Sequence, residues 1–142
     1  MSVAVDIKPL PSHVHATLSG EFTVDGVKTA LTQMVRAGHG HPNQKLLIDC
    51  LGLRGDPSLR ERFELVSHAF QLRINAVMEG KRPVLQTAIV AVPPLAHPNR
   101  YAVRLLVERS IRDTLCERTD EALAWLGVPG GQEGAATSGP AG

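Results

Sequence analysis

Two short runs of apolar residues limit this chain to a small set of folds. Lys45–Cys50 and Thr87–Val92 are almost continuously apolar, whereas a half-buried strand would alternate apolar and polar residues. Such runs are typical of central strands in a parallel sheet, because both faces of that sheet are covered. Each run is followed by a longer amphipathic segment with helical spacing. The alternation of strands and helices predicts an α/β domain with a mostly parallel sheet.

An antiparallel pair of strands is predicted before the first helix. Val3–Leu10 and His13–Leu18 both alternate apolar with polar residues, and prolines between them favour a turn. We expect the first strand to lie at the edge of the sheet, where its free backbone can pair with another strand. A homodimer formed through this edge is one hypothesis.

The remaining apolar spacing predicts helices. In the second helix we expect Asp56 as the cap, Pro57 in the first helical position, and Gly80 at the end. A very short strand is expected near Leu115–Glu117. The other predicted helices are Thr23–Ala37 (ended by Gly38), Asn99–Leu115 and Thr119–Leu126 (closed by Gly127). The predicted inward stripe of the second helix is Leu59, Phe63, Val66, Phe70, Ile74 and Val77.

Composition narrows the classes of function. A chain of 142 residues is expected to form one domain, here residues 1–127, followed by a disordered Gly/Pro/Ala-rich tail at 128–142. The formal net charge of +1 and the 4% of aromatic residues argue against nucleic-acid binding. No apolar run reaches the roughly 18 residues of a membrane span. The N-terminus lacks the basic segment of a secretory signal, and Cys50 and Cys116 are expected to be reduced, so we expect a cytoplasmic protein.

The order of the motifs resembles the SpoIIAA-like family, which shares the STAS fold and is often grouped with CRAL-TRIO-like lipid-carrier domains. The resemblance covers roughly residues 3–127. It implies a single STAS-like domain with four to five strands, an antiparallel edge hairpin and about four helices. The motifs that carry it are Lys45-Leu-Leu-Ile-Asp49 with a Gly-containing loop, Thr87–Val92 before Arg100 and a helix, and Arg118-Thr-Asp-Glu-Ala-Leu-Ala-Trp-Leu126.

The same resemblance implies a candidate phosphoacceptor, Ser58. In the sporulation regulators of this family, an anti-sigma kinase phosphorylates a serine that begins the helix after the central strand, within an Asp-Ser-Ser-Gly motif. Here the corresponding segment reads Asp56-Pro57-Ser58-Leu59. Pro57 and Leu59 differ from the motif, and its glycine is missing. The alternative is that Ser58 only satisfies backbone amides in the first turn of the helix.

The carboxyl ends of the two apolar strands are the expected binding edge. Ligands of α/β sheets usually bind there, and helix N-termini at this edge favour anions. The segments Asp49–Ser58 and Pro93–Asn99 should therefore form a site for a partner protein, a phosphate, a carboxylate or a phosphoserine. The alternative is ordinary helix capping beside solvated arginines. The predicted edge consists of Asp49, Arg54, Asp56, Ser58, Arg60, His97 and Arg100.

Other chemistry finds less support in the sequence. Ser58 and His97 can be combined with an aspartate into a hydrolase-like set, but the Gly-x-Ser-x-Gly turn is missing. His13 and His15 share a strand face, while His39 and His41 are expected in a solvated loop after the first helix. Nothing in the sequence brings the histidine pairs together with a further ligand, so we expect no metal.

We therefore expect a non-catalytic, cytoplasmic regulatory domain that binds a protein partner through the predicted edge, as an anti-sigma-factor antagonist would. No cofactor, nucleic acid or membrane span is expected. The alternative is a carrier or sensor of a small apolar, lipid-like ligand or of an anionic one. Its pocket is predicted under Phe63 and Phe70 of the second helix.

Overall fold

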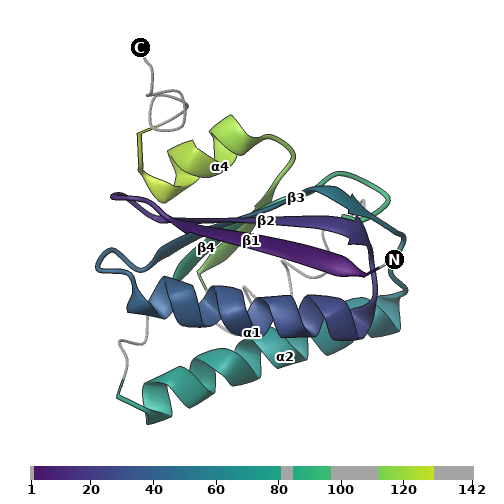
Figure 1. Ribbon diagram of the computed structural model, residues 1–142, viewed down its shortest axis with the longest axis horizontal. Coiled ribbons are helices and arrows are strands. Elements are labelled where there is room, and N and C mark those ends of the chain that lie inside the picture. Colours follow the sequence, from purple (N-terminus) through teal and green to yellow (C-terminus); the bar gives the residue numbers. More distant parts are fainter. Residues whose placement is uncertain (1, 81–84, 97–111, 130–142) are drawn as a thin grey trace.

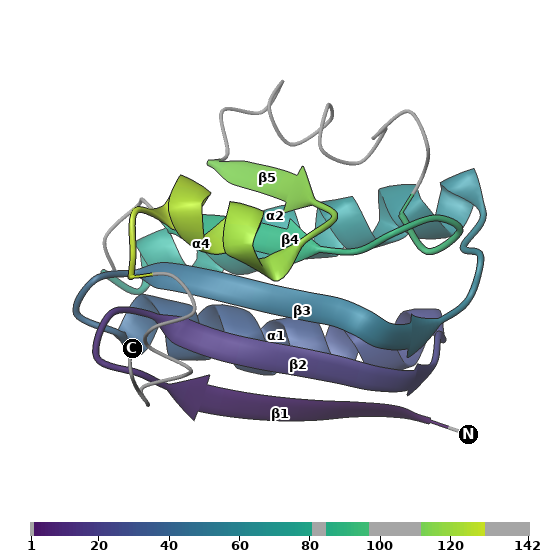
Figure 2. The same ribbon diagram turned by 90° about the horizontal axis from the view of Figure 1, so that it is seen from above.

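A five-stranded sheet organises the chain (Figures 1 and 2). The computed structural model describes residues 2–80, 85–96 and 112–129. The first strand pairs antiparallel with the second, and the other three pairs are parallel, as the sequence predicted. The strands lie side by side in chain order: β1 (Val3–Pro9), β2 (Val14–Glu21), β3 (Lys45–Arg54), β4 (Gln86–Val90) and β5 (Asp113–Cys116).

Helices cover both faces of this sheet. Figure 1 shows α1 (Val24–Gly40) and α2 (Leu59–Met78) below the sheet and α4 (Thr119–Leu126) above it. These are the three helices of the described residues. The predicted third helix, Asn99–Leu115, falls mostly outside them, and its last residue, Leu115, belongs to strand β5 rather than to a helix.

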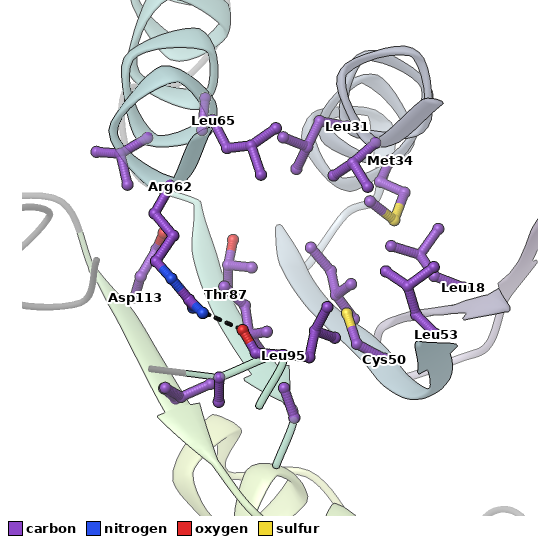
Figure 3. Close-up of a pocket in the computed structure, with 18 of the residues that line it drawn as sticks. Leu18, Leu31, Met34, Cys50, Leu53, Arg62, Leu65, Thr87, Leu95 and Asp113 are labelled. Atoms are coloured by element: carbon purple, nitrogen blue, oxygen red, sulfur yellow. Dashed lines mark hydrogen bonds between the residues drawn. The ribbon is translucent and has the colours of Figure 1, made fainter. Parts of the chain in front are cut away.

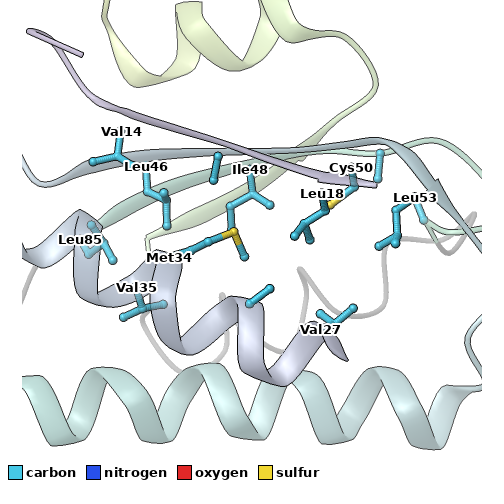
Figure 4. Close-up of a cluster of buried hydrophobic side chains, with 14 residues drawn as sticks. Val14, Leu18, Val27, Met34, Val35, Leu46, Ile48, Cys50, Leu53 and Leu85 are labelled. Carbon is cyan, nitrogen blue, oxygen red and sulfur yellow. The ribbon is translucent and has the colours of Figure 1, made fainter. Parts of the chain in front are cut away.

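The two-sided core explains why β3 reads as a continuous apolar run. Leu46, Ile48 and Cys50 belong to the larger core cluster, beneath which α1 packs (Figure 4). Leu47 lies on the opposite face with Leu123 of α4. Because successive side chains of a strand point to opposite faces, a strand covered on both sides needs apolar residues at every position.

Helix α1 begins as predicted but ends later. Thr23 is its N-cap and accepts a hydrogen bond from the amide of Gly26 at 3.1 Å. Gly38 lies inside the helix rather than ending it. A Cβ atom at Gly38 would lie 3.0 Å from Leu85 Cδ1, so the glycine allows a close approach of helix and core.

The histidines after Gly38 are buried rather than solvated, which corrects the predicted loop. His39 belongs to the last turn of α1, and His41 is its C-cap. His41 Nε2 lies 2.7 Å from the carbonyl oxygen of Leu10, and its Nδ1 accepts a hydrogen bond from the amide of Asn43. His41 therefore connects the end of α1 to the turn between β1 and β2.

Helix α2 starts two residues later than predicted and presents a different face inward. Its N-cap is Ser58, not Asp56. Four residues of the predicted inward stripe are exposed: Leu59, Phe63, Ile74 and Val77. The buried positions are Arg62, Val66, Arg73 and Ala76. Apolar spacing predicted the wrong face because two of the inward positions are arginines, whose charges are met by specific partners.

Strand β1 bears on the predicted homodimer. Strand β1 ends the sheet and carries exposed Asp6 and Lys8, charges that disfavour pairing between edge strands. The homodimer through this edge stays a prediction.

Val128 donates a backbone hydrogen bond to Leu123 and packs against the α4 side of the core. The rest of the predicted tail, from residue 130, lies outside the described residues.

Candidate functional site

Arg62 joins the two segments that the sequence placed at one edge. Its Nε donates to the carbonyl oxygen of Pro57 at 3.0 Å, at the start of α2. Its two terminal nitrogens donate to the carbonyl oxygens of Leu95 at 2.6 Å and Pro94 at 2.9 Å, in the segment after β4. Figure 3 shows Arg62 beside Leu95. The connections that follow β3 and β4 are thus held together by one buried side chain that sequence reasoning missed.

The charge of Arg62 is only partly balanced. Among the described residues, its ion-pair partner is Asp56, whose carboxylate oxygen lies 3.6 Å away and whose side chain is 79% exposed. Burial lowers the pKa of the Arg62 guanidinium, while the charges of Asp56 and Glu61 act in the opposite direction. Arginine remains protonated in proteins, so this edge keeps a buried positive charge held mainly by carbonyl oxygens.

Ser58 is exposed at the N-terminus of α2, where it forms a reciprocal cap. Its Oγ accepts a hydrogen bond from the amide of Glu61 at 3.1 Å. The carboxylate of Glu61 accepts one from the amide of Ser58 at 2.8 Å. A phosphate on Ser58 would lie at the positive end of the helix dipole, but it would compete with the Glu61 carboxylate for that position. The geometry therefore suits a cap and leaves the hydroxyl accessible.

Two predicted arginines differ in their surroundings. Arg54, at the end of β3, forms an ion pair with Glu21 at 2.8 Å, and its Nε donates to the same carboxylate at 2.9 Å. Arg60 is exposed on the first turn of α2. Arg54, Asp56, Ser58 and Arg60 follow one another through the β3–α2 connection, which gives this edge an exposed surface of mixed charge.

Asp49 lies apart from Ser58. It stands between Ile48 and Cys50 in β3, and the alternation of the strand places it on the α4 face of the sheet. Its carboxylate accepts a hydrogen bond from the amide of Leu51 at 2.9 Å. Asp49 is therefore a strand residue that supports the local backbone, and the structure does not bring it to the helix start.

Cys50 faces the opposite way from Asp49 and is buried. Burial, with a smaller effect of the Asp49 charge, raises the pKa of the Cys50 thiol to about 12. The thiol stays protonated near neutral pH, and a protonated thiol is a poor nucleophile. Cys50 is therefore a core residue rather than a reactive thiol.

The predicted edge residues His97 and Arg100 lie outside the described residues, so the hydrolase-like set of Ser58 and His97 stays a prediction. In the ranges that the structure describes, no three His, Cys, Asp or Glu residues form a group that could hold a metal ion. None of the helices in those ranges combines the length and the apolar character needed to cross a membrane.

A cavity of about 180 Å³ lies between the sheet and helices α1 and α2. Figure 3 shows Leu31 and Met34 of α1 and Leu65 of α2 facing Leu18 and Cys50 of the sheet across this space. Phe63 and Phe70, predicted to cover a pocket, do not line it. The rotation of α2 brings other residues to the cavity, whose roof from this helix consists of Arg62, Leu65, Val66, Ala69 and Arg73.

A buried ion pair borders the same cavity and was also missed by sequence reasoning. Arg73 of α2 contacts both carboxylate oxygens of Asp113 in β5, at 2.8 and 3.0 Å. Arg73 Nη2 also donates to Thr87 Oγ1 of β4 at 2.7 Å. Burial raises the pKa of the Asp113 carboxyl, and Arg73 acts against this rise. The pair therefore connects the helix layer to two strands of the sheet.

One sequence signal could have revealed this inward face. Arg62 and Arg73 are separated by about three helical turns, so they lie on one side of α2 together with Val66 and Ala69. That stripe contains smaller residues than the predicted one and two arginines. Apolar periodicity alone assigns this stripe to the surface, because the partners that satisfy the two arginines come from distant parts of the chain.

The cap role of Ser58 has a measurable consequence. We expect Ser58→Ala to lower the free energy of unfolding by about 1 kcal/mol, since the side-chain acceptor for the Glu61 amide is lost. Urea denaturation monitored by circular dichroism measures the change. Ser67→Ala, at an exposed position within α2, is the matched control and should change stability by less than about 0.5 kcal/mol. Equal stabilities of the two variants would contradict the cap.

Comparisons with known proteins bear on the fold. No protein-family model matches the chain, and no curated protein matches its sequence. Among solved structures, one match is the crystal structure of an anti-sigma factor antagonist from Mycobacterium paratuberculosis. The TM-score is 0.52, the sequence identity is 16%, and the match covers 88% of this chain and 94% of that chain. The strand order, the antiparallel edge and the structural match agree, and the chain has the SpoIIAA-like STAS fold that its motifs predicted.

Proposed function

We propose that this chain is a non-catalytic, cytoplasmic regulatory domain that binds a protein partner through the start of α2 and the connection before it. The observation that carries the proposal is Ser58, an exposed serine at the N-terminus of the helix after the central strand of a STAS fold. The structural match to an anti-sigma factor antagonist supports a partner of the anti-sigma factor class. Phosphorylation of Ser58 is the proposed switch.

The physical basis of the switch is a change of surface charge without a change of fold. A phosphate on Ser58 adds close to two negative charges at neutral pH. It would lie among the exposed charges of Asp56 and Arg60 and the half-buried charge of Glu61, on a helix start that tolerates anions. The buried hydrogen bonds of Arg62 hold the neighbouring segments, so the partner would meet the same surface with a different charge.

The non-catalytic part of the proposal rests on how the candidate groups are engaged. Ser58 Oγ is paired with the amide of Glu61 rather than with a histidine, within the described residues. The Cys50 thiol is buried and protonated. The cytoplasmic part is supported by Cys50, a buried cysteine that is not in a disulfide.

The test measures binding of the anti-sigma factors of the source organism to purified wild-type protein, Ser58→Ala and Ser58→Glu by calorimetry. We expect wild type and Ser58→Ala to bind at least one of them. Ser58→Glu should bind the same anti-sigma factor at least about tenfold more weakly, which corresponds to a loss of about 1.4 kcal/mol of binding free energy. The same anti-sigma factor, if it is a kinase, should transfer phosphate from ATP to wild type and not to Ser58→Ala.

Ser67→Glu is the matched control, because it places the same charge about two and a half turns further along α2 at an exposed site. It should bind like wild type. The absence of binding by every anti-sigma factor would contradict the partner class. Equal binding by Ser58→Glu and wild type would contradict the switch and leave the partner class standing.

A second candidate function is that of a carrier or sensor of a small, mainly apolar molecule. The cavity between the sheet and the helices supports it. Its volume of about 180 Å³ is similar to that of engineered apolar cavities that take up benzene. The anionic version of this candidate finds less support at the predicted edge, where Arg54 is already paired with Glu21. Mass spectrometry of the native protein from its own host would detect a bound molecule.

A further inference from the structure

The charges in the wall of the cavity between the sheet and helices α1 and α2 do not cancel. Three of the described residues in this wall are charged: Arg62, Arg73 and Asp113. Arg73 and Asp113 lie 2.8 Å apart, with side chains that are 10% and 4% exposed, so they neutralise one another. Asp56, the ion-pair partner of Arg62, lies 3.6 Å away and does not line the cavity. The wall therefore contains one unmatched positive charge, that of Arg62.

The guanidinium of Arg62 can donate more hydrogen bonds than the protein accepts. A guanidinium has five N–H groups. Three of these donate to the carbonyl oxygens of Pro57, Leu95 and Pro94, and the 3.6 Å to Asp56 is too long for a hydrogen bond. One N–H group on each terminal nitrogen therefore has no acceptor among the described residues. Two such donors suit a carboxylate, which accepts hydrogen bonds on both of its oxygens.

The rest of the wall places hydrocarbon next to this cation. Leu65 and Val66 follow Arg62 by three and four positions on α2, so the three side chains share one side of the helix. Figure 3 shows Arg62 on one side of the space and Met34 of α1 on the other. The volume of about 180 Å³ is enough for one aromatic ring with a small substituent, since engineered apolar cavities of about 150 Å³ bind benzene.

The unmatched cation determines the charge of the occupant. A cationic guest would add a second positive charge beside Arg62, and a neutral guest would leave the buried guanidinium without a close counter-ion. An anionic guest would supply that counter-ion, which a buried charge needs. The Asp56 side chain is 79% exposed, so its own charge stays in contact with water when a guest pairs with Arg62. An acid with an apolar body therefore matches both parts of the wall.

We propose that the cavity binds a small monocarboxylate with an apolar body, whose carboxylate pairs with Arg62. The body occupies the space between Met34, Ile48 and Leu65. This inference rests on the second candidate function, a carrier or sensor, and gives its ligand a chemical class. The anionic group binds inside the cavity rather than at the predicted edge, and the inference does not depend on the switch at Ser58.

The test compares three probes on the intact chain that have nearly the same shape and differ in charge: benzoate, benzamide and benzamidine. Calorimetry or ligand-observed NMR at neutral pH measures each affinity. Benzoate is expected to bind about tenfold more tightly than benzamide, because it gains hydrogen bonds from a charged donor. Benzamidine, a cation at this pH, is expected to bind more weakly than benzamide, because it adds a second positive charge to the wall.

Two variants place the binding in the cavity. Ala69→Leu reduces the space from the α2 side and should abolish the binding of benzoate. Ser67→Leu adds the same side chain to α2 at an exposed position and should leave that binding unchanged. Benzoate binding that survives Ala69→Leu would place the site elsewhere and overturn the proposal.

Variants of charged residues assign the carboxylate to Arg62. Asp56→Asn removes the competing carboxylate, so benzoate should bind about threefold more tightly and benzamide as it does to wild type. Asp56 is exposed and is not the cap of α2, so this variant keeps the fold. Arg62→Met, shown to be folded by circular dichroism, should bind benzoate and benzamide equally. Arg36→Met, which removes an exposed charge from α1, should keep the preference for benzoate.

The outcomes separate the ligand class from the carrier function. If benzamide binds as tightly as benzoate and Ala69→Leu abolishes the binding, the cavity is a ligand site and the proposed class is wrong. A preference for benzoate that persists in Arg62→Met, or is unchanged in Asp56→Asn, would overturn the assignment to Arg62. If no probe binds and protein from its own host contains no small molecule, the carrier function and the proposed class both fail. A host molecule that lacks a carboxylate would overturn the class alone.

Discussion

Replacing Arg73 with methionine is expected to lower the free energy of unfolding by about 3–5 kcal/mol, the largest effect expected for a single substitution here. Methionine can fill the apolar space, but it leaves the Asp113 carboxylate buried without its counter-ion and removes the donor to Thr87. Chemical denaturation at neutral pH measures the change. Arg36→Met, at an exposed position of α1, is the control and should stay within about 0.5 kcal/mol of wild type.

The pH dependence of this variant tests the cause. Burial raises the pKa of Asp113, and Arg73 is the group that opposes the rise, so the pKa should increase further in Arg73→Met. A carboxyl whose pKa is higher in the folded than in the unfolded state binds more protons when folded. The free energy of unfolding then rises as the pH falls through the interval between the two pKa values. Arg73→Met should therefore regain part of its stability in mild acid, relative to wild type.

The paired variant separates a buried charge from lost packing. Arg73→Met with Asp113→Leu should be more stable than Arg73→Met alone, because no unpaired charge remains. If the paired variant is as unstable as the single one, packing of the arginine chain carries the effect instead. A loss below 1 kcal/mol in Arg73→Met would mean that the ion pair does not hold α2 to the sheet.

The sheet could be predicted from the sequence because its signals are local. Lys45–Cys50 needs apolar residues on both faces, and β1 and β2 alternate as strands with one covered face do. Thr23 lies where a cap is expected, and it is the N-cap of α1. Each of these features depends on residues close together in the chain, so one sequence contains the whole signal.

The inward face of α2 could not be predicted in the same way. Its buried positions include Arg62 and Arg73, which apolar periodicity assigns to the surface. Leu95, a partner of Arg62, lies more than thirty positions further along the chain, and Asp113, the partner of Arg73, lies forty positions further. The cavity follows from the same arrangement, since Ala69 fills less of the space under the helix than Phe63 or Phe70 of the predicted stripe would.

The sequence predicted the candidate edge correctly only where chain order alone decides the position of a residue. Ser58 and Asp56 follow β3 directly, so the chain order places them at the strand end. Asp49 was assigned to the same edge by its position near the end of the apolar run, but β3 continues to Arg54 and alternation turns Asp49 to the α4 face. Because the strand is four residues longer than predicted, Asp49 does not lie at the strand end beside Asp56 and Ser58.

Arg62→Met is expected to lower the free energy of unfolding by about 2–4 kcal/mol. The substitution removes three hydrogen bonds from a charged donor and leaves the carbonyl groups of Pro57, Pro94 and Leu95 to find other donors. Hydrogen bonds to charged groups contribute about 1.5–3 kcal/mol each, and relaxation of the exposed segments toward water recovers part of the sum. Thermal or urea denaturation measures the loss.

Arg60→Met is the matched control, because it removes the same charge two positions earlier on the exposed side of α2. It should change stability by less than about 0.5 kcal/mol. Hydrogen exchange adds a second readout. In Arg62→Met the amide of Ala96, which donates to the carbonyl oxygen of Val92, should exchange faster than in wild type. Amides in β2 should exchange only as much faster as the loss of global stability requires. If both variants behave alike, Arg62 does not hold the segment after β4 against the start of α2, and the two halves of the proposed binding edge are independent.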